Sequence, residues 1–211
     1  PQVISFGKSV LPTMVYGNTM TLSATSDQAA AEGIFTYSVD GSAATIVNDT
    51  ILKATATGKV TLTVSRVADG NYSAAVATQT IEIMPKPITV TVGAIEKVYD
   101  GTAAVTLPTF TLAGQLSGAN VDVNKADLTF NFANKNVGDK VDVLMPELKL
   151  TGDDAANYTL IQPKNVTGKI TKARLLVKVK DVTRMWNQRY TKYEFEAEGL
   201  VNGETLSNVY N

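Results

Sequence analysis

The side chains that could do chemistry in this 211-residue chain are mainly carboxylates, because the sequence contains neither cysteine nor histidine. That absence excludes thiol nucleophiles, zinc sites of cysteine and histidine, and Ser-His-Asp triads. Glu194, Glu196 and Glu198 alternate with Phe195 and Ala197, which places three carboxylates on one face of a predicted strand. A metal site or a glycosidase pair would use such groups, but a solvated strand face is the simpler interpretation.

A second group of carboxylates, Asp100, Asp153 and Asp154, would bind calcium only if folding brought their oxygens together. The alternative is that they are turn residues, since Asp100 directly precedes Gly101 and aspartate accepts hydrogen bonds in turns. Neither group matches a recognised catalytic pattern. We therefore predict no catalytic residue, no cofactor-binding residue, no metal ligand and no cofactor, and we expect that the chain is not an enzyme.

Basic residues gather in one late stretch, where Asp181 is the only acid. One interpretation is a site for a polyanion, and the other is a row of outward lysines that deters association of strand edges. The formal net charge of −1 gives the whole chain no attraction to nucleic acid or to an anionic membrane. The cluster holds 8 of the 19 basic residues: Lys169, Lys172, Arg174, Lys178, Lys180, Arg184, Arg189 and Lys192.

The single tryptophan, Trp186, has two interpretations. If it is exposed with Tyr190 and Tyr193, the three rings would form an aromatic platform that favours glycan recognition. If it is buried, it packs where two units of the chain meet, which we favour because a large aromatic ring buries much surface.

The elements that must position these side chains are strands, because the dominant hydrophobic pattern has a period of two. Val60, Leu62 and Val64 alternate with threonines, and the same alternation recurs in the stretches 88–92, 128–132, 141–143 and 175–179. Short strands separated by glycine, asparagine and aspartate turns predict an all-β fold of antiparallel β-sandwiches.

One turn occurs twice. The stretches 69–72 and 154–158 both begin with aspartate and end in Asn-Tyr, and Tyr72 and Tyr158 lie 86 positions apart. A repeat of domain length indicates tandem modules. Each turn could be a binding edge, but we favour a structural role in which the tyrosine buries its ring while its hydroxyl bonds to the backbone.

Several stretches carry a resemblance to known families. Lys97-Val98-Tyr99-Asp100-Gly101-Thr102, followed by the stretches 132–138 and 152–160, resembles the YDG domain of large bacterial surface proteins over residues 88–172. The stretches 183–187 and 199–205 look like the opening half of an MBG domain, a mostly bacterial immunoglobulin-like repeat, over residues 173–211. With Tyr16-Gly17, the stretch 58–63 and Asn71-Tyr72, residues 1–84 are similar to bacterial immunoglobulin-like repeats. The resemblance implies β-sandwiches in exported, adhesin-like proteins and no catalytic residue.

Together these observations predict tandem immunoglobulin-like antiparallel β-sandwiches: one over 1–84, a proline-containing linker at 85–87, a YDG-like one over 88–172 and a partial unit over 173–211. The partial unit should pack on the second unit, pair with another copy or be poorly ordered, because half a sandwich exposes strand edges and an apolar face.

The function expected from this organisation is a non-catalytic spacer or stalk in a bacterial cell-surface or secreted adhesin-like protein. The alternative is a module that binds a glycan or a host matrix protein. The expected location is extracellular, at the bacterial surface. Expected partners are a host or bacterial surface glycan or protein and neighbouring repeats of the same chain. We expect no nucleic acid and no membrane insertion, since no apolar run approaches the roughly 20 residues that cross a bilayer.

Overall fold

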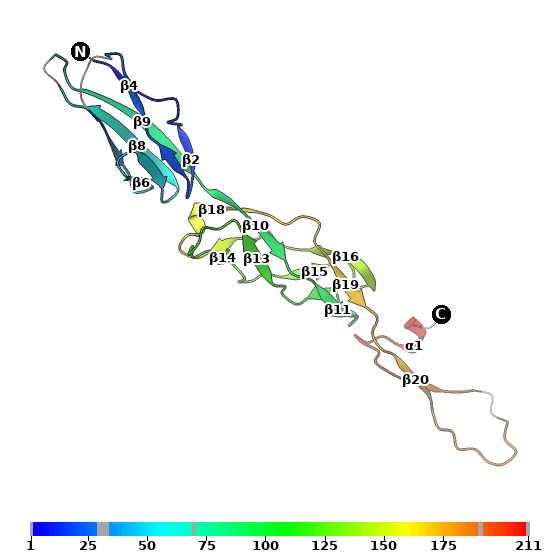
Figure 1. Ribbon diagram of the computed structural model, residues 1–211. Coiled ribbons are helices and arrows are strands. Elements are labelled where there is room, and N and C mark those ends of the chain that lie inside the picture. Colours follow the sequence, from blue (N-terminus) through cyan, green and yellow to red (C-terminus); the bar gives the residue numbers. More distant parts are fainter. Residues whose placement is uncertain (1, 29–33, 69–70, 190–191, 210–211) are drawn as a thin grey trace. The chain divides into compact units, whose positions relative to one another are not determined.

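The computed structural model describes residues 2–28, 34–68, 71–189 and 192–209, and its regular structure is almost entirely β-strand (Figure 1). The exceptions in the described part are a 3-10 turn, η1 (Ala155–Asn157), and a four-residue helix, α1 (Leu206–Val209). The predicted all-β class is therefore confirmed. By its contacts the chain divides into a first unit, residues 1–90, 112–124 and 148–162, and a second unit, residues 91–111, 125–147 and 163–211.

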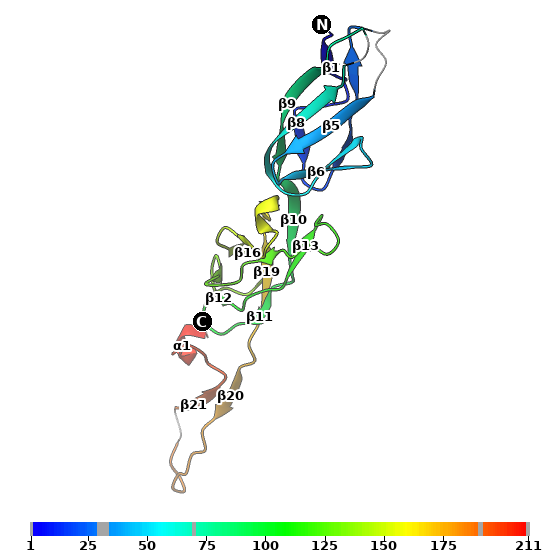
Figure 2. The same cartoon turned by 90° about the vertical axis from the view of Figure 1, so that its left-hand side faces the viewer.

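The N-terminal part of the first unit contains three sheets, and Figure 2 shows strands of the largest side by side. The four-stranded sheet has the order β2 (Thr13–Val15), β9 (Ala75–Met84), β8 (Gly58–Arg66) and β5 (Phe35–Asp40). The three-stranded sheet has the order β3 (Thr19–Thr21), β7 (Ile51–Ala54) and β6 (Ala44–Val47). A third sheet pairs β1 (Ile4–Phe6) with β4 (Ala24–Ser26).

These sheets share one hydrophobic core, because their strands alternate apolar residues with threonine and other polar residues. Leu62 of β8, Ile81 of β9 and Leu52 of β7 are fully buried in a single cluster. The cluster also includes Ile88 and Tyr158, which follow Pro85 in the chain. The core of the N-terminal strands therefore continues beyond the predicted end of the first domain.

The predicted linker at 85–87 is shorter in the structure. Only Pro85 separates β9 from β10 (Lys86–Val92), so Lys86 and Pro87 already belong to a strand. Proline is tolerated near the start of a strand, where its missing N–H removes little of the hydrogen-bond ladder. The connection between β9 and β10 is thus a single residue.

The remaining strands of the first unit include β10, which lies between β13 (Phe110–Ala113) and β18 (Tyr158–Ile161). A short pair joins β14 (Asp122–Val123) to β17 (Leu150–Thr151). Strands β10 and β13 extend from the first unit into the second.

The second unit is built on a five-stranded sheet with the order β11 (Glu96–Val98), β19 (Thr167–Thr171), β16 (Gly138–Leu144), β15 (Phe130–Phe132) and β12 (Ala104–Val105). Its apolar side buries Phe130, Phe132 and Ile170. A separate pair, β20 (Leu176–Val179) and β21 (Phe195–Glu198), lies after it in the chain (Figure 2).

The prediction of purely antiparallel sheets is corrected by three parallel pairs, β2 with β9, β10 with β18 and β11 with β19. Parallel neighbours need a long crossover, and here most of a unit separates the two strands of each pair in the chain. Period-two alternation places side chains on a face but leaves the direction of the neighbouring strand open. Among the described residues, no helix is long and apolar enough to cross a membrane.

We expect Leu62→Ala to lower the free energy of unfolding of the first unit by about 2–5 kcal/mol, because the fully buried Leu62 would leave a cavity between sheets. Leu11→Ala is the matched control, since Leu11 is exposed and its truncation should change stability by no more than about 0.5 kcal/mol. Urea denaturation followed by circular dichroism measures both. Equal losses in the two variants would contradict the assigned core.

Candidate functional site

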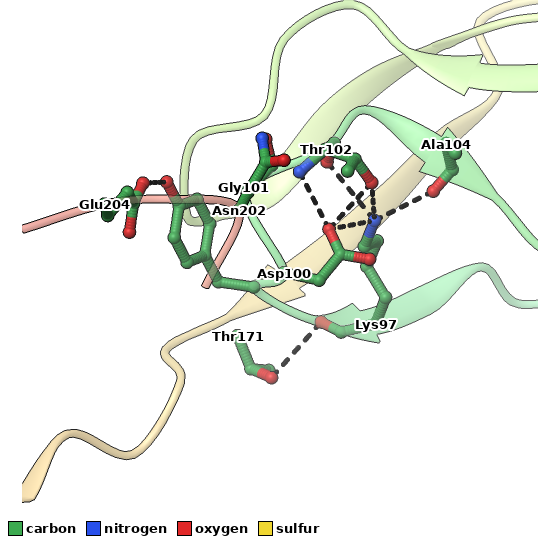
Figure 3. Close-up of polar contacts among 9 residues, drawn as sticks. Lys97, Asp100, Gly101, Thr102, Ala104, Thr171, Asn202 and Glu204 are labelled. Carbon is green, nitrogen blue, oxygen red and sulfur yellow. Dashed lines mark hydrogen bonds and ion pairs between the residues drawn. The ribbon is translucent and has the colours of Figure 1, made fainter. Parts of the chain in front are cut away.

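The turn that follows β11 holds a dense polar network around a single side chain, Lys97 (Figure 3). Lys97 directs its ammonium group to four acceptors: the Asp100 carboxylate at 2.7 Å, the Thr102 carbonyl at 3.2 Å and hydroxyl at 3.1 Å, and the Ala104 carbonyl at 2.9 Å. An ammonium group has three N–H donors, so this one is fully engaged. Lys97 closes the turn and is not available as a nucleophile or an anion-binding group.

Asp100 completes the turn from the other side. Its Oδ1 accepts hydrogen bonds from the Thr102 backbone N–H at 2.9 Å and from the Thr102 hydroxyl at 2.8 Å. The hydrogen bond from Lys97, together with those from Thr102, lowers the pKa of Asp100 to about 2. A carboxylate held ionised in this way is a poor proton donor at neutral pH. The predicted turn role of Asp100 is thus confirmed.

Tyr99 and Gly101 form hydrogen bonds with a later stretch of the same unit. The Tyr99 hydroxyl donates a hydrogen bond to Glu204, and the Asn202 amide donates one to the Gly101 carbonyl at 3.0 Å. The Lys135 ammonium lies 3.8 Å from Glu204. The hydrogen bond to Glu204 raises the pKa of the Tyr99 hydroxyl. The turn after β11 therefore anchors the residues just before α1.

The Asn-Tyr turn at 157–158 makes a comparable set of contacts inside the first unit. Asn157 Oδ1 accepts a hydrogen bond from the Thr57 backbone N–H at 2.9 Å. The Tyr158 hydroxyl accepts one from the Leu116 backbone N–H at 3.1 Å. Its ring meets the Tyr16 ring edge to face, with centroids 5.4 Å apart and an interplanar angle of 87°. Both rings are buried, with Tyr158 6% and Tyr16 8% exposed.

The structural role predicted for the repeated turn is confirmed at Tyr158, which buries its ring and bonds to backbone through its hydroxyl. The earlier copy differs, since Tyr72 is only half-buried. Asp69 and Gly70, which open that copy, lie outside the described residues.

The carboxylates of the predicted strand face are solvated and partly paired with lysine. Glu198 lies 2.9 Å from the Lys178 ammonium, and Glu194 lies 3.4 Å from that of Lys180. In the part of the chain that the structure describes, no three acidic side chains are grouped so that they could hold a metal ion. These residues behave as the exposed face of a two-stranded ribbon.

The aspartates considered for calcium are also engaged. Asp153 and Asp154 accept hydrogen bonds from Asn120, through its side-chain amide at 3.0 Å and its backbone N–H at 2.8 Å respectively. Asp100 is paired with Lys97. Asp153 and Asp154 thus link two segments that are distant in the chain, and Asp100 closes its own turn.

Several lysines of the basic cluster are paired with carboxylates that lie outside its stretch of the sequence. Lys169 pairs with Asp139 at 3.0 Å, in addition to the pairs of Lys178 and Lys180 with glutamates. Exposed pairs of this kind contribute little to stability, but they reduce the local positive potential. The strand interpretation of Lys178 and Lys180 therefore accounts better for the cluster than a polyanion site does.

The packing role predicted for Trp186 is wrong, because its side chain is 96% exposed. The physical reason is that β20 and β21 pair only with each other among the described strands, so no apolar face is available to cover the loop between them. Tyr193 is also exposed, at 65%, whereas Tyr190 lies outside the described residues.

Several residues of these contact sites were not predicted as partners: Tyr16, Thr57, Leu116, Asn202 and Glu204. The stretches 97–102 and 199–205 were both recognised as motifs, but of two different resemblances, to the YDG domain and to the MBG domain. No local pattern connects residues about 100 positions apart in a chain. Only the fold brings the two stretches together.

Comparison with known proteins supports one of the resemblances. Residues 84–167 match the family model of the YDG domain, so this part of the chain is similar to that family. The match includes the turn after β11 and the Asn-Tyr turn. No curated protein matches the chain.

We expect the carboxyl group of Asp100 to titrate near pH 2 instead of near its ordinary pKa of 3.8, because Lys97 and Thr102 favour the ionised form. Since the pKa is depressed in the folded state, the stabilising contribution is present above 3.8 and is lost as the pH falls through about 2. Carboxyl carbon chemical shifts measured by NMR follow this titration. Lys97→Met should return the pKa towards 3.8, and a wild-type value already at 3.8 would contradict the assignment.

Proposed function

We propose that the chain is a non-catalytic spacer or stalk segment of a bacterial cell-surface or secreted adhesin-like protein. The observation that carries this proposal is the use of the motif side chains. Those of the turn after β11 and of the Asn-Tyr turn contact other segments of the chain, including Asn202, Glu204 and Thr57. Residues used in this way serve architecture, because their polar groups are already engaged.

The proposal includes immunoglobulin-like sandwiches as the repeated element. In support, the order β2-β9-β8-β5 in one sheet corresponds to β11-β19-β16-β15 in the other. Each has one outer parallel pair, β2 with β9 and β11 with β19, followed by antiparallel neighbours. We assign the ribbon of β20 and β21 to the opening of a further MBG-like unit on the same grounds as before, namely its sequence resemblance.

The mechanical part of the proposal is resistance to bending within the first unit. A single residue, Pro85, separates β9 from β10, and proline removes one backbone rotation. The buried contact of Tyr16 with Tyr158 then restrains the strands on either side of Pro85. A spacer needs such restraint, since a flexible connection would let its ends approach each other.

We expect small-angle scattering of the 211-residue chain to give a radius of gyration well above the roughly 17 Å of a compact protein of this length. An insertion of glycine and serine residues after Pro85 should lower the average radius of gyration, because it frees the restrained connection and allows bent conformers. The matched control carries the same insertion after Asp127, in an exposed turn between strands. A compact profile for the unaltered chain would contradict the spacer proposal.

A second candidate function is the binding of a glycan or a host matrix protein, and the exposed Trp186 is the observation that favours it. Sugar-binding surfaces use flat aromatic rings, and the exposed Trp186 lines an open hollow together with Arg184 and Arg189. The same partners, a surface glycan or protein, remain the proposal for the segment as a whole, at an extracellular location.

If the loop binds a glycan, the chain should give a signal on a glycan array that is lost in Trp186→Ala, because the ring supplies the stacking surface. Met185→Ala is the control, since Met185 is an exposed neighbour without a ring. Blank glycan and matrix-protein arrays with the unaltered chain would count against this second function.

A further inference from the structure

Two turns far apart in the chain have the same form. Gly114 and Gly118 enclose one, directly after β13, and Gly199 and Gly203 enclose the other, directly after β21. The two pairs lie 85 positions apart. Their φ angles agree closely, at 97° and 79° in the first turn and 101° and 74° in the second. We call these the docking turns.

The hydrogen bonding of the docking turns also agrees. In the first, the Ala119 N–H donates to the Leu116 carbonyl at 3.2 Å, and in the second the Glu204 N–H donates to the Val201 carbonyl at 3.0 Å. In both turns, the carbonyl that accepts this hydrogen bond belongs to the second residue after the first glycine. A shared backbone form at a fixed spacing indicates a shared role.

Each docking turn contacts a tyrosine-glycine turn that precedes it in the chain, within the same unit. The first contacts Tyr16-Gly17, directly after β2, and the second contacts Tyr99-Asp100-Gly101, directly after β11. We call these two turns the sockets.

The sockets are equivalent in their own hydrogen bonding. The Tyr16 N–H donates to the carbonyl of Met84, the last residue of β9, at 2.9 Å. The Tyr99 N–H donates to the carbonyl of Thr171, the last residue of β19, at 2.8 Å. Each socket is thus fixed to the end of the strand that leads onward in the chain.

Two separate constraints, the backbone conformation and the space for a side chain, require glycine in each socket. Gly17 and Gly101 have φ angles of 84° and 77°, which side chains other than hydrogen rarely allow. A Cβ atom on Gly17 would lie 2.6 Å from Leu116 Cδ1, and one on Gly101 would lie 2.5 Å from Asn202 Cβ. A residue of the docking turn therefore occupies the space that a side chain on this glycine would need.

By segment we mean one repeat of the sequence, about 86 residues long. We propose that the tyrosine-glycine turn of one segment is a socket for the glycine-bounded turn of the segment that follows, and that this contact is the joint between consecutive segments. The inference rests on the proposed spacer function, because it describes how such a spacer would be held together.

The chemistry of each joint is matched to its own pair of turns. The first joint is apolar, since Leu116 fills the space above Gly17 and the Tyr16 ring packs on Tyr158. The second is polar, since Asn202 bonds to the Gly101 carbonyl while Tyr99 and Lys135 contact Glu204. A socket therefore accepts a following turn of complementary chemistry, which would set the order of neighbouring segments.

Distance measurements between two spin labels test the second joint in the 211-residue chain, whose lack of cysteine lets labels be placed at chosen positions. We place them at Asn131→Cys on β15 and Glu196→Cys on β21, two exposed positions on strands of the second unit. The otherwise unaltered chain should give one narrow distance. Gly101→Ala should lose it and give a broad distribution, because the added methyl group excludes Asn202.

Two variants separate the contact from backbone strain. Gly203→Ala is the matched control, since Gly203 lies in the second docking turn with a similar φ angle, 74°, but its added Cβ would meet nothing within 4 Å, and the distance should stay narrow. Asn202→Gly introduced into Gly101→Ala removes both the atom that the methyl group meets and the hydrogen bond to Gly101, so it should narrow the distribution only in part. Tyr99→Phe removes only the hydroxyl and should broaden the distance even if Gly101→Ala fails to fold.

A narrow distance in Tyr99→Phe together with a narrow distance in Gly101→Ala would overturn the joint. The two experiments can reject the joint and the spacer proposal independently of each other. A compact scattering profile rejects the spacer while the label distances still respond to the substitutions, whereas an extended profile with unresponsive distances rejects the joint alone.

Discussion

The edge-to-face contact between Tyr16 and Tyr158 is the interaction on which the first unit depends most. It joins the residue directly after β2 to the first residue of β18, and both rings belong to the same core as Leu62 and Ile88. Small β-units have little interior, so a core that continues past Pro85 buries more apolar surface than two separate ones would. This continuity explains why the contact-based division of the chain does not follow the sequence repeat.

Polar side chains in the motifs mostly serve turns and contacts between segments. Lys97 illustrates this, because an ammonium group with four acceptors at 2.7–3.2 Å has no free donor for a ligand. Asp100 is held ionised by the same network. Chemistry at such a site would need a group left without partners, in a cavity that tunes its pKa. The exposed ring of Trp186 is the feature most unlike this pattern, which is why binding remains the second candidate.

Prediction from sequence succeeded where a structural feature depends only on residues close to one another in the chain. The alternation of Val60, Leu62 and Val64 predicted a half-buried strand, and β8 contains all three as buried residues. Trp186 failed for the opposite reason, because burial of a large ring depends on whether another element covers it. The parallel pairing of β2 with β9 was missed as well, since strand direction depends on the path of the chain and not on the alternation.

The sequence by itself determined the strands, the turns and the resemblance of residues 84–167 to the YDG domain, because period-two alternation and turn residues act over a few positions. The tertiary structure alone decided what the turns contact. Gly101 was recognisable as a turn glycine, but the space above it has meaning only once Asn202 fills it from 101 positions away. Contacts of that kind depend on the packing of distant strands, and no local pattern in the chain encodes them.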